Sequence, residues 1–219
     1  MKIKKSRIFI LVLGVTLFTL LFSAPSCDRC KPEPNCDTCL VDYKPNIYFF
    51  PEQAVQLNVK LEFPLGGRVI KSEPLYQTGW DVRIDASGLI DERYGFLFYE
   101  SVQPDVWQHE QGWCVKKEDL NVFFESNLKE YGFGEKEISD FKEYWIPIFT
   151  KSNYYLIYPQ TKSIIDKAIK LSVSIQPDRI LRLHYLVKAT NEFDGTIIAP
   201  AIEEFRREGF YITEWGVIL

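Results

Sequence analysis

The stretch Val55-Gln56-Leu57-Asn58-Val59-Lys60-Leu61-Glu62-Phe63 is the most regular pattern in the chain. Apolar and polar side chains alternate along it, and successive side chains of a β-strand point to opposite faces of a sheet. The stretch therefore predicts a strand with one buried face and one face in water. A sheet of such strands is the starting point for the fold.

Shorter alternating or aromatic runs predict further strands on both sides of this one. They lie at 47–50, 68–72, 80–84, 94–100, 171–175, 181–187 and 211–215. Pro177-Asp178 has turn chemistry and would join 171–175 to 181–187 as a hairpin. The polar side of the 181–187 run carries Arg182 and His184, and we expect that side to face solvent.

Two segments between the predicted strands have apolar residues at the spacing of an α-helix. Apolar residues recur on one helical face up to Tyr131, and Gly132 is placed to cap that helix in the left-handed conformation. A second helix starts near Glu135 and bends or ends at Pro147. The short joint between them predicts an antiparallel helical hairpin at about 116–150 that packs on the sheet.

Together the strands and helices predict one α+β domain, with a mostly antiparallel sheet and an inserted helical hairpin, over residues 45–219. A further short helix is expected around 202–207. Residues 27–44 carry scattered prolines and charges without an apolar period, which is typical of a tether.

The first 26 residues have the features of an export signal. Basic residues come first, the uncharged apolar run 8–22 follows, and small residues then lead into Cys27. We predict a lipoprotein-type signal peptide over 1–26, lipidation of Cys27, and a membrane-anchored location in the cell envelope, outside the cytoplasm. An uncleaved N-terminal anchor and free secretion are the alternatives.

The cysteines are concentrated just after this signal. Four lie between Cys27 and Cys39, and the fifth is Cys114. If Cys27 is lipidated, an even set remains, which suits disulfides in an oxidising compartment. The disulfide candidates are Cys30, Cys36, Cys39 and Cys114, with a link from the tether to Cys114. Zinc is a less favoured alternative, because the two CxxC pairs lie much closer together than those of a zinc ribbon.

The charge balance bears on the choice of partner. Removal of residues 1–26 takes away four positive charges and lowers the formal net charge from −4 to −8. An acidic domain is not attracted to phosphate backbones by its overall field. Nucleic acid is therefore not an expected partner, and no motif indicates a cofactor or a metal.

No complete catalytic motif is present. Cys114 lies five residues after His109 and could form a thiol–histidine pair. Glu100 and Glu214 could act as the paired carboxylates of a glycosidase. No spacing rule selects either pair, so these four residues are weak candidates, and an envelope hydrolase is the alternative function.

Three tryptophans are candidates for ligand binding. Trp80, Trp107 and Trp113 lie in or next to predicted turns. Aromatic side chains in such positions can anchor a protein or a glycan by stacking and by the large area that they bury.

A series of short strings across residues 44–216 resembles, in order, an uncharacterised family of exported bacterial proteins. The strings are Lys44-Pro-Asn-Ile-Tyr-Phe-Phe-Pro51, Gly79-Trp80, Phe96-Leu-Phe-Tyr-Glu100, Gly112-Trp-Cys-Val115, Tyr144-Trp-Ile-Pro147, Pro177-Asp-Arg-Ile-Leu-Arg182 and Glu214-Trp-Gly216. The resemblance implies one exported domain and assigns no activity. We therefore expect a lipoprotein that binds a protein or a glycan, with a hydrolase or a structural assembly subunit as alternatives.

Overall fold

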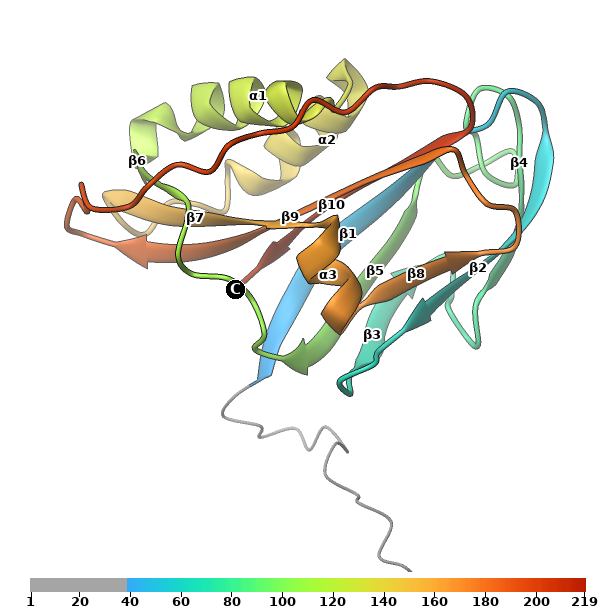
Figure 1. Cartoon of the computed structure of the whole chain (residues 1–219), viewed down its shortest axis with the longest axis horizontal. Coiled ribbons are helices and arrows are strands. Elements are labelled where there is room, and N and C mark those ends of the chain that lie inside the picture. The colour runs from blue at the N-terminus through green and yellow to red at the C-terminus, as the bar shows by residue number, and fades with distance from the viewer. Residues whose placement is uncertain (1–38) are drawn as a thin grey trace, which may run out of the picture.

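The computed structural model describes residues 39–219 (Figure 1). Within this range a seven-stranded sheet has the order β3-β5-β1-β10-β9-β7-β6, and a three-stranded sheet has the order β4-β2-β8. Among the described strand pairs, β9 and β10 run parallel and the others run antiparallel. The fold is α+β with a mostly antiparallel sheet, as the sequence predicted.

The strands are β1 Cys39–Phe50, β2 Val55–Glu62, β3 Arg68–Glu73, β4 Trp80–Ile84, β5 Leu97–Pro104, β6 Trp113–Lys116, β7 Tyr154–Thr161, β8 Lys170–Val173, β9 Arg179–Thr190 and β10 Tyr211–Ile218. The helices are α1 Leu120–Tyr131, α2 Glu135–Trp145 and α3 Lys162–Ala168, with a short 3₁₀ turn at Lys117–Asp119. None of the described helices is long and apolar enough to cross a membrane.

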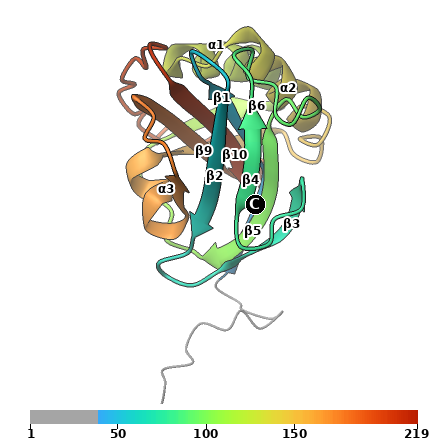
Figure 2. The same ribbon diagram turned by 90° about the vertical axis from the view of Figure 1, so that its right-hand side faces the viewer.

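The large sheet is covered on both faces. The hairpin of α1 and α2 lies on one face, and the small sheet and α3 lie against the other (Figures 1 and 2). Phe124, Phe141 and Trp215 are central to the core under the hairpin. Ile47 and Leu57 belong to the second core, between the two sheets. Because β9 and β10 lie in the middle, they are buried on both sides.

Predictions that depend only on the residues of a single strand or helix are confirmed. In β2, Leu57 and Leu61 are buried, while Lys60 and Glu62 between and after them are exposed. Gly132 has a φ of 102° and caps α1, with its N–H directed at the carbonyls at the end of that helix. The antiparallel helical hairpin is confirmed.

Two predictions that depend on distant contacts are wrong. The runs at 171–175 and 181–187 do not form a hairpin, because β8 pairs with β2 in the small sheet and β9 pairs with β7 and β10 in the large one. The helix expected around 202–207 is also absent. Residues 199–208 instead have no regular secondary structure, and we call them the strap.

The strap is held against the hairpin by side-chain contacts that helix formation would break. Arg207 Nη1 donates to both oxygens of the Glu137 carboxylate at the start of α2, at 3.1 and 2.9 Å. Phe205 lies against Gly132, where an added Cβ would come within 2.9 Å of the Phe205 Cβ. These tertiary contacts override the helical pattern of the sequence.

The N-terminal boundary of the domain also differs from the expected one. β1 begins at Cys39, so residues 39–44 of the expected tether are part of the sheet. The predicted signal peptide, Cys27, Cys30 and Cys36 lie outside the described residues. Their predicted roles stay predictions.

Candidate functional site

A network of charged side chains crosses the large sheet inside the core between the two sheets. Asp42 of β1, Arg182 and His184 of β9 and Glu214 of β10 are at most 1% exposed. The register of the parallel pair sets Glu214 beside Arg182 and Gly216 beside His184. The strands therefore place four charged groups in one layer that is shielded from bulk solvent.

His184 lies between two carboxylates. Its Nδ1 is 2.6 Å from Oδ2 of Asp42, and its Nε2 is 3.3 Å from Oε1 of Glu214. Both distances are short enough for ion pairs, but neither contact has the geometry of a hydrogen bond. We therefore describe them as ion pairs.

Arg182 connects the large sheet to α3. Its Nε and Nη2 bind the two oxygens of Glu214, and its Nη1 donates to Asp166 Oδ1 of α3 at 2.7 Å. Nη1 also donates to the carbonyl of Ile169 at 2.6 Å. Tyr99 of β5 completes the shell of Glu214 by donating its hydroxyl to Oε1 at 2.7 Å.

The mutual attraction within the network decides its charge state. Burial opposes the charge on His184, but the nearby carboxylates outweigh it and raise the pKa of His184 to about 9. Burial also opposes the charge on Glu214, yet Arg182 and His184 hold its pKa far below the usual range. Burial raises the pKa of Asp42, against the attraction of His184.

His184 is therefore an imidazolium with a carboxylate at each ring nitrogen. A general base needs a free lone pair within reach of a substrate proton. Neither ring nitrogen of His184 offers one, and the ring is shielded from solvent. The network is built to hold strands together rather than to transfer protons to a ligand.

Gly216 makes room for the pair of Asp42 and His184. A Cβ at this position would lie 2.9 Å from Asp42 Oδ1 and 3.2 Å from His184 Cδ2. β10 separates β1 from β9, so the two side chains meet over its backbone. Only glycine leaves space for this contact.

The two carboxylates proposed as a glycosidase pair do not meet. Glu214 faces the core between the sheets, where it binds Tyr99. Glu100 follows Tyr99 in β5, and neighbouring residues of a strand point to opposite faces. Glu100 instead lies 3.6 Å from Lys71 Nζ. The sheet itself therefore separates the two carboxylates.

The thiol–histidine pair is not assembled either. His109 Nδ1 lies 3.0 Å from Lys188 Nζ, an ammonium that can only donate, so its lone pair is occupied. His109 Nε2 lies 3.6 Å from Asp105. Cys114 Sγ accepts the backbone N–H of Asp194 at 3.3 Å. Each member of the predicted pair thus has other partners.

Within residues 39–219, Cys114 forms no disulfide. In the order of the large sheet β6 lies four strands from β1, so at about 4.8 Å per strand Cys39 and Cys114 are roughly 20 Å apart. A disulfide requires Cα atoms within about 7 Å. The expected link between the tether and Cys114 is therefore not made by Cys39.

Two of the three candidate tryptophans belong to the core. Trp80 and Trp107 are 2% and 4% exposed. Trp80 donates its indole N–H to the carbonyl of Pro74 at 2.8 Å. Trp113 is half-buried on the edge strand β6, where its ring meets that of Phe123 edge-on at 5.4 Å. Of the three, Trp113 is the one that a ligand can reach.

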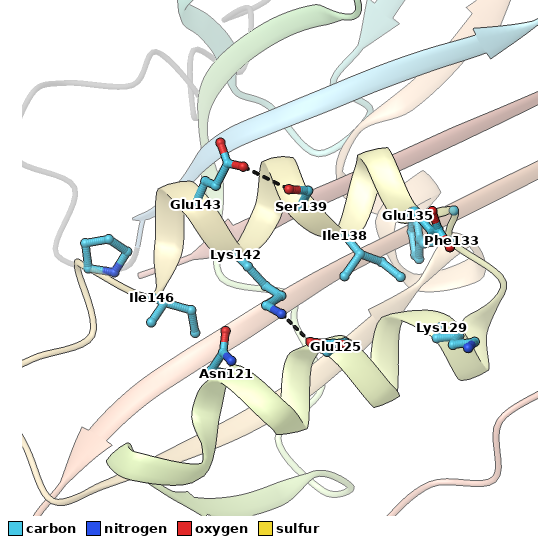
Figure 3. Close-up of a pocket in the computed structure, with 12 residues that line it drawn as sticks. Asn121, Glu125, Lys129, Phe133, Glu135, Ile138, Ser139, Lys142, Glu143 and Ile146 are labelled. Atoms are coloured by element: carbon cyan, nitrogen blue, oxygen red, sulfur yellow. Dashed lines mark hydrogen bonds and ion pairs between the residues drawn. The ribbon is translucent and has the colours of Figure 1, made fainter.

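A groove of about 620 Å³ runs between α1 and α2 on the outer side of the hairpin (Figure 3). Figure 3 shows Lys142 and Ile138 of α2 pointing toward α1, with a dashed line from Lys142 to Glu125. This ion pair bridges the two helices. The Lys142–Glu125 ion pair therefore crosses the groove and divides it.

The surface along the outer edge of β6 is more apolar. We define the β6-edge surface by Tyr154, Phe193 and Ile198. Phe193 and Ile198 are 64% and 69% exposed, and the Phe193 ring lies 5.7 Å from that of Tyr154. Ile198 is fixed beside β6, because its carbonyl accepts the N–H of Gly112 at 2.9 Å.

The chain matches no protein-family model, no curated protein and no solved structure. Within residues 39–219, no group of three or more His, Cys, Asp and Glu side chains is arranged to hold a metal ion. The resemblance to exported bacterial proteins stays a prediction.

Sequence reasoning missed the buried network and placed His184 at the surface, which is wrong. The alternation of Arg182 and His184 with apolar residues is the pattern of a strand with one solvent-exposed face. In the structure the polar side of β9 is turned toward the small sheet and α3 instead. The signal that could have revealed this is the matching charge of Glu214 in another apolar strand, because buried charges occur in pairs.

Proposed function

We propose that this chain is an extracytoplasmic lipoprotein, held to a membrane by Cys27, whose domain binds a protein partner and catalyses no reaction. The observation that carries the proposal is the β6-edge surface. Large apolar side chains are exposed there beside an edge strand. The charged side chains of the buried network, in contrast, are shielded inside the core. Exposed apolar patches of this kind are typical of protein interaction sites.

The composition of this surface favours a protein over a glycan. Phe193 and Ile198 offer aromatic and aliphatic area, and aromatic anchors dominate the energetics of protein interfaces. A sugar site needs flat, open aromatic platforms, and Trp80 and Trp107 are enclosed in the core.

The hydrolase alternative has less support. The sheet separates Glu100 from Glu214. His109 and Cys114 each have other partners. A structural assembly subunit would also use edge strands. It differs from the proposed module in having further copies of itself as partners.

The proposal is tested by site-specific photo-crosslinking in cells that express the full chain. A photoreactive residue replaces Phe193 in one variant and Ile198 in a second. Leu75, 74% exposed beyond the opposite edge strand β3, carries the probe in the control. We expect discrete adducts of the same partner from positions 193 and 198 and none from position 75.

A second substitution checks that the adduct reports binding. Ile198→Asp in the chain with the probe at 193 should abolish the adduct, because a charge in the patch must be desolvated on binding. Equal adducts at 75 and 193, or no adduct at either edge position, would overturn the proposed site. An adduct with a second copy of this chain would favour the assembly subunit.

A further inference from the structure

A half-buried lysine lies among aromatic rings beside α2, on the face of the large sheet that carries the helical hairpin. Lys44 Nζ is 4.1 Å from the centroid of Phe98, 5.1 Å from that of Phe96 and 5.4 Å from that of Tyr144. The two phenylalanines come from the start of β5 and the residue before it, and Tyr144 comes from α2. We call these three rings the Lys44 cage.

The backbone is distorted where it directs Lys44 toward the rings. Lys44 has a φ of 56°, in the left-handed region, although it is not glycine. Here β1 bulges before Asn46, where the register shifts in its pairing with both β10 and β5. Such a conformation costs roughly 1–3 kcal/mol and is often found at functional sites, and bulges redirect side chains.

A second lysine shares the cage. Lys71 Nζ lies 5.3 Å from the centroid of Phe98 and forms an ion pair with Glu100 at 3.6 Å. Burial and then the positive charge of Lys71 lower the pKa of Lys44, against the attraction of Glu100, Glu73 and Asp140. Near neutral pH, Lys44 therefore carries more of the uncharged amine than an ordinary lysine does.

These are the two means by which proteins activate a lysine as a nucleophile, namely desolvation and a neighbouring cation. The lysines that form Schiff bases with carbonyl compounds are activated in this way. Three aromatic rings lie within 5.4 Å of Nζ, and their apolar faces suit a small carbonyl compound with an aliphatic or aromatic substituent.

We propose that Lys44 captures a small aldehyde or ketone as an imine inside the aromatic cage. The amine nitrogen of Lys44 attacks the carbonyl carbon, the π electrons move to oxygen, and a proton passes from nitrogen to oxygen to give a carbinolamine. Protonation of its hydroxyl lets water leave as C=N forms, and the resulting iminium returns its N–H proton to solvent to give the imine. One amine and one carbonyl thus give one imine and one water, without oxidation or reduction.

Glu100 has a part in this step that differs from the glycosidase role expected at first. Its carboxylate is 12% exposed and lies beside Lys71 at the edge of the cage. It is one of the carboxylates whose charge acts on Lys44. Its negative charge therefore favours the positively charged iminium that precedes the imine.

The test uses acetaldehyde with sodium cyanoborohydride, which reduces each imine to a stable ethylamine. The folded protein is labelled for short times at pH 7, and ethylation of each lysine is measured by peptide mass spectrometry. We expect Lys44 to be labelled several-fold faster than the exposed Lys60 and Lys151. The difference should shrink as the pH rises toward 10, where every lysine loses its proton.

Two variants separate the activating environment from simple accessibility. Lys71→Gln removes the neighbouring charge and should slow labelling of Lys44 several-fold, while Lys188→Gln, on β9 and two strands away from β1, should not change it. Lys44→Arg keeps a positive charge on the rings and should remove the fast site alone. Labelling of Lys44 no faster than that of Lys60, or unaffected by Lys71→Gln, would overturn the proposal.

Discussion

Asp42 and His184 belong to strands that are not neighbours, yet their side chains meet 2.6 Å apart over the backbone of β10. The contact depends on Gly216, because any side chain there would occupy the space of the pair. Strands β1, β10 and β9 are thus connected by side chains as well as by their backbone hydrogen bonds.

The first prediction concerns pH. The pKa of His184 is raised from 6.5 to about 9 on folding. The stability that this provides is fully present below about pH 6.5 and is lost as the pH rises through about 9. The loss is at most about 3 kcal/mol. Urea unfolding between pH 6 and 9.5 should show this decline.

The decline should depend on the buried histidine. In Asp42→Asn/His184→Gln, which removes both charges of the pair, the fall in stability over this pH range should be much smaller. His109→Gln, at the surface, is the matched control and should keep the fall. The same pH profile in the double variant and the parent would show that His184 is not its source.

The second prediction concerns Gly216. Gly216→Ala should destabilise the domain by about 1–3 kcal/mol, because the added methyl group overlaps Asp42 and forces the ion pair apart. Thermal or urea unfolding measures the change. Gly95→Ala is the control, since a Cβ there meets only the end of Lys136 at 3.8 Å, and it should change stability little.

The third prediction concerns the strap. Glu137 is 2% exposed and receives Arg207 as its cationic partner, besides the N–H of Gly134 and the hydroxyl of Thr213. Arg207→Ala should cost about 2 kcal/mol, because a buried carboxylate loses a charged donor. Hydrogen exchange over residues 199–208 should become faster. Arg206→Ala, its exposed neighbour, should leave both measurements unchanged.

The fourth prediction concerns the anchor. Intact-mass analysis of membrane-extracted protein should show an N-terminal Cys27 that carries acyl groups. Cys27→Ser should remove the acyl groups and leave residues 1–26 on the chain, because acylation of the thiol precedes cleavage of a lipoprotein signal. Recovery of the parent chain itself with residues 1–26 and without acyl groups would instead indicate an uncleaved anchor.

The sequence predicts what neighbouring residues decide among themselves. The strand at β2 follows from its own alternation, and the end of α1 follows from Gly132, whose left-handed conformation few other residues adopt. Likewise the two helices and the joint between them lie within one continuous segment. These features need no information about the remainder of the chain.

The features that could not be predicted depend on a second layer. Arg182 and His184 look like the wet side of a strand, and only the small sheet and α3 make that side an interior. Pro177-Asp178 does lie in the connection between β8 and β9, but this connection leads from one sheet to the other instead of closing a hairpin. Periodicity tells which residues share a face, and it does not tell what covers that face.

The position of β10 also constrains the order of assembly. β10 follows the nine other described strands in the sequence, yet it lies between β1 and β9 in the centre of the large sheet. A chain that emerges from its N-terminus first cannot close the sheet until residues 211–218 appear. Until then Arg182 and His184 lack Glu214, and two central strands have open edges. Closure of the sheet therefore depends on contacts between distant parts of the sequence, which makes folding slow.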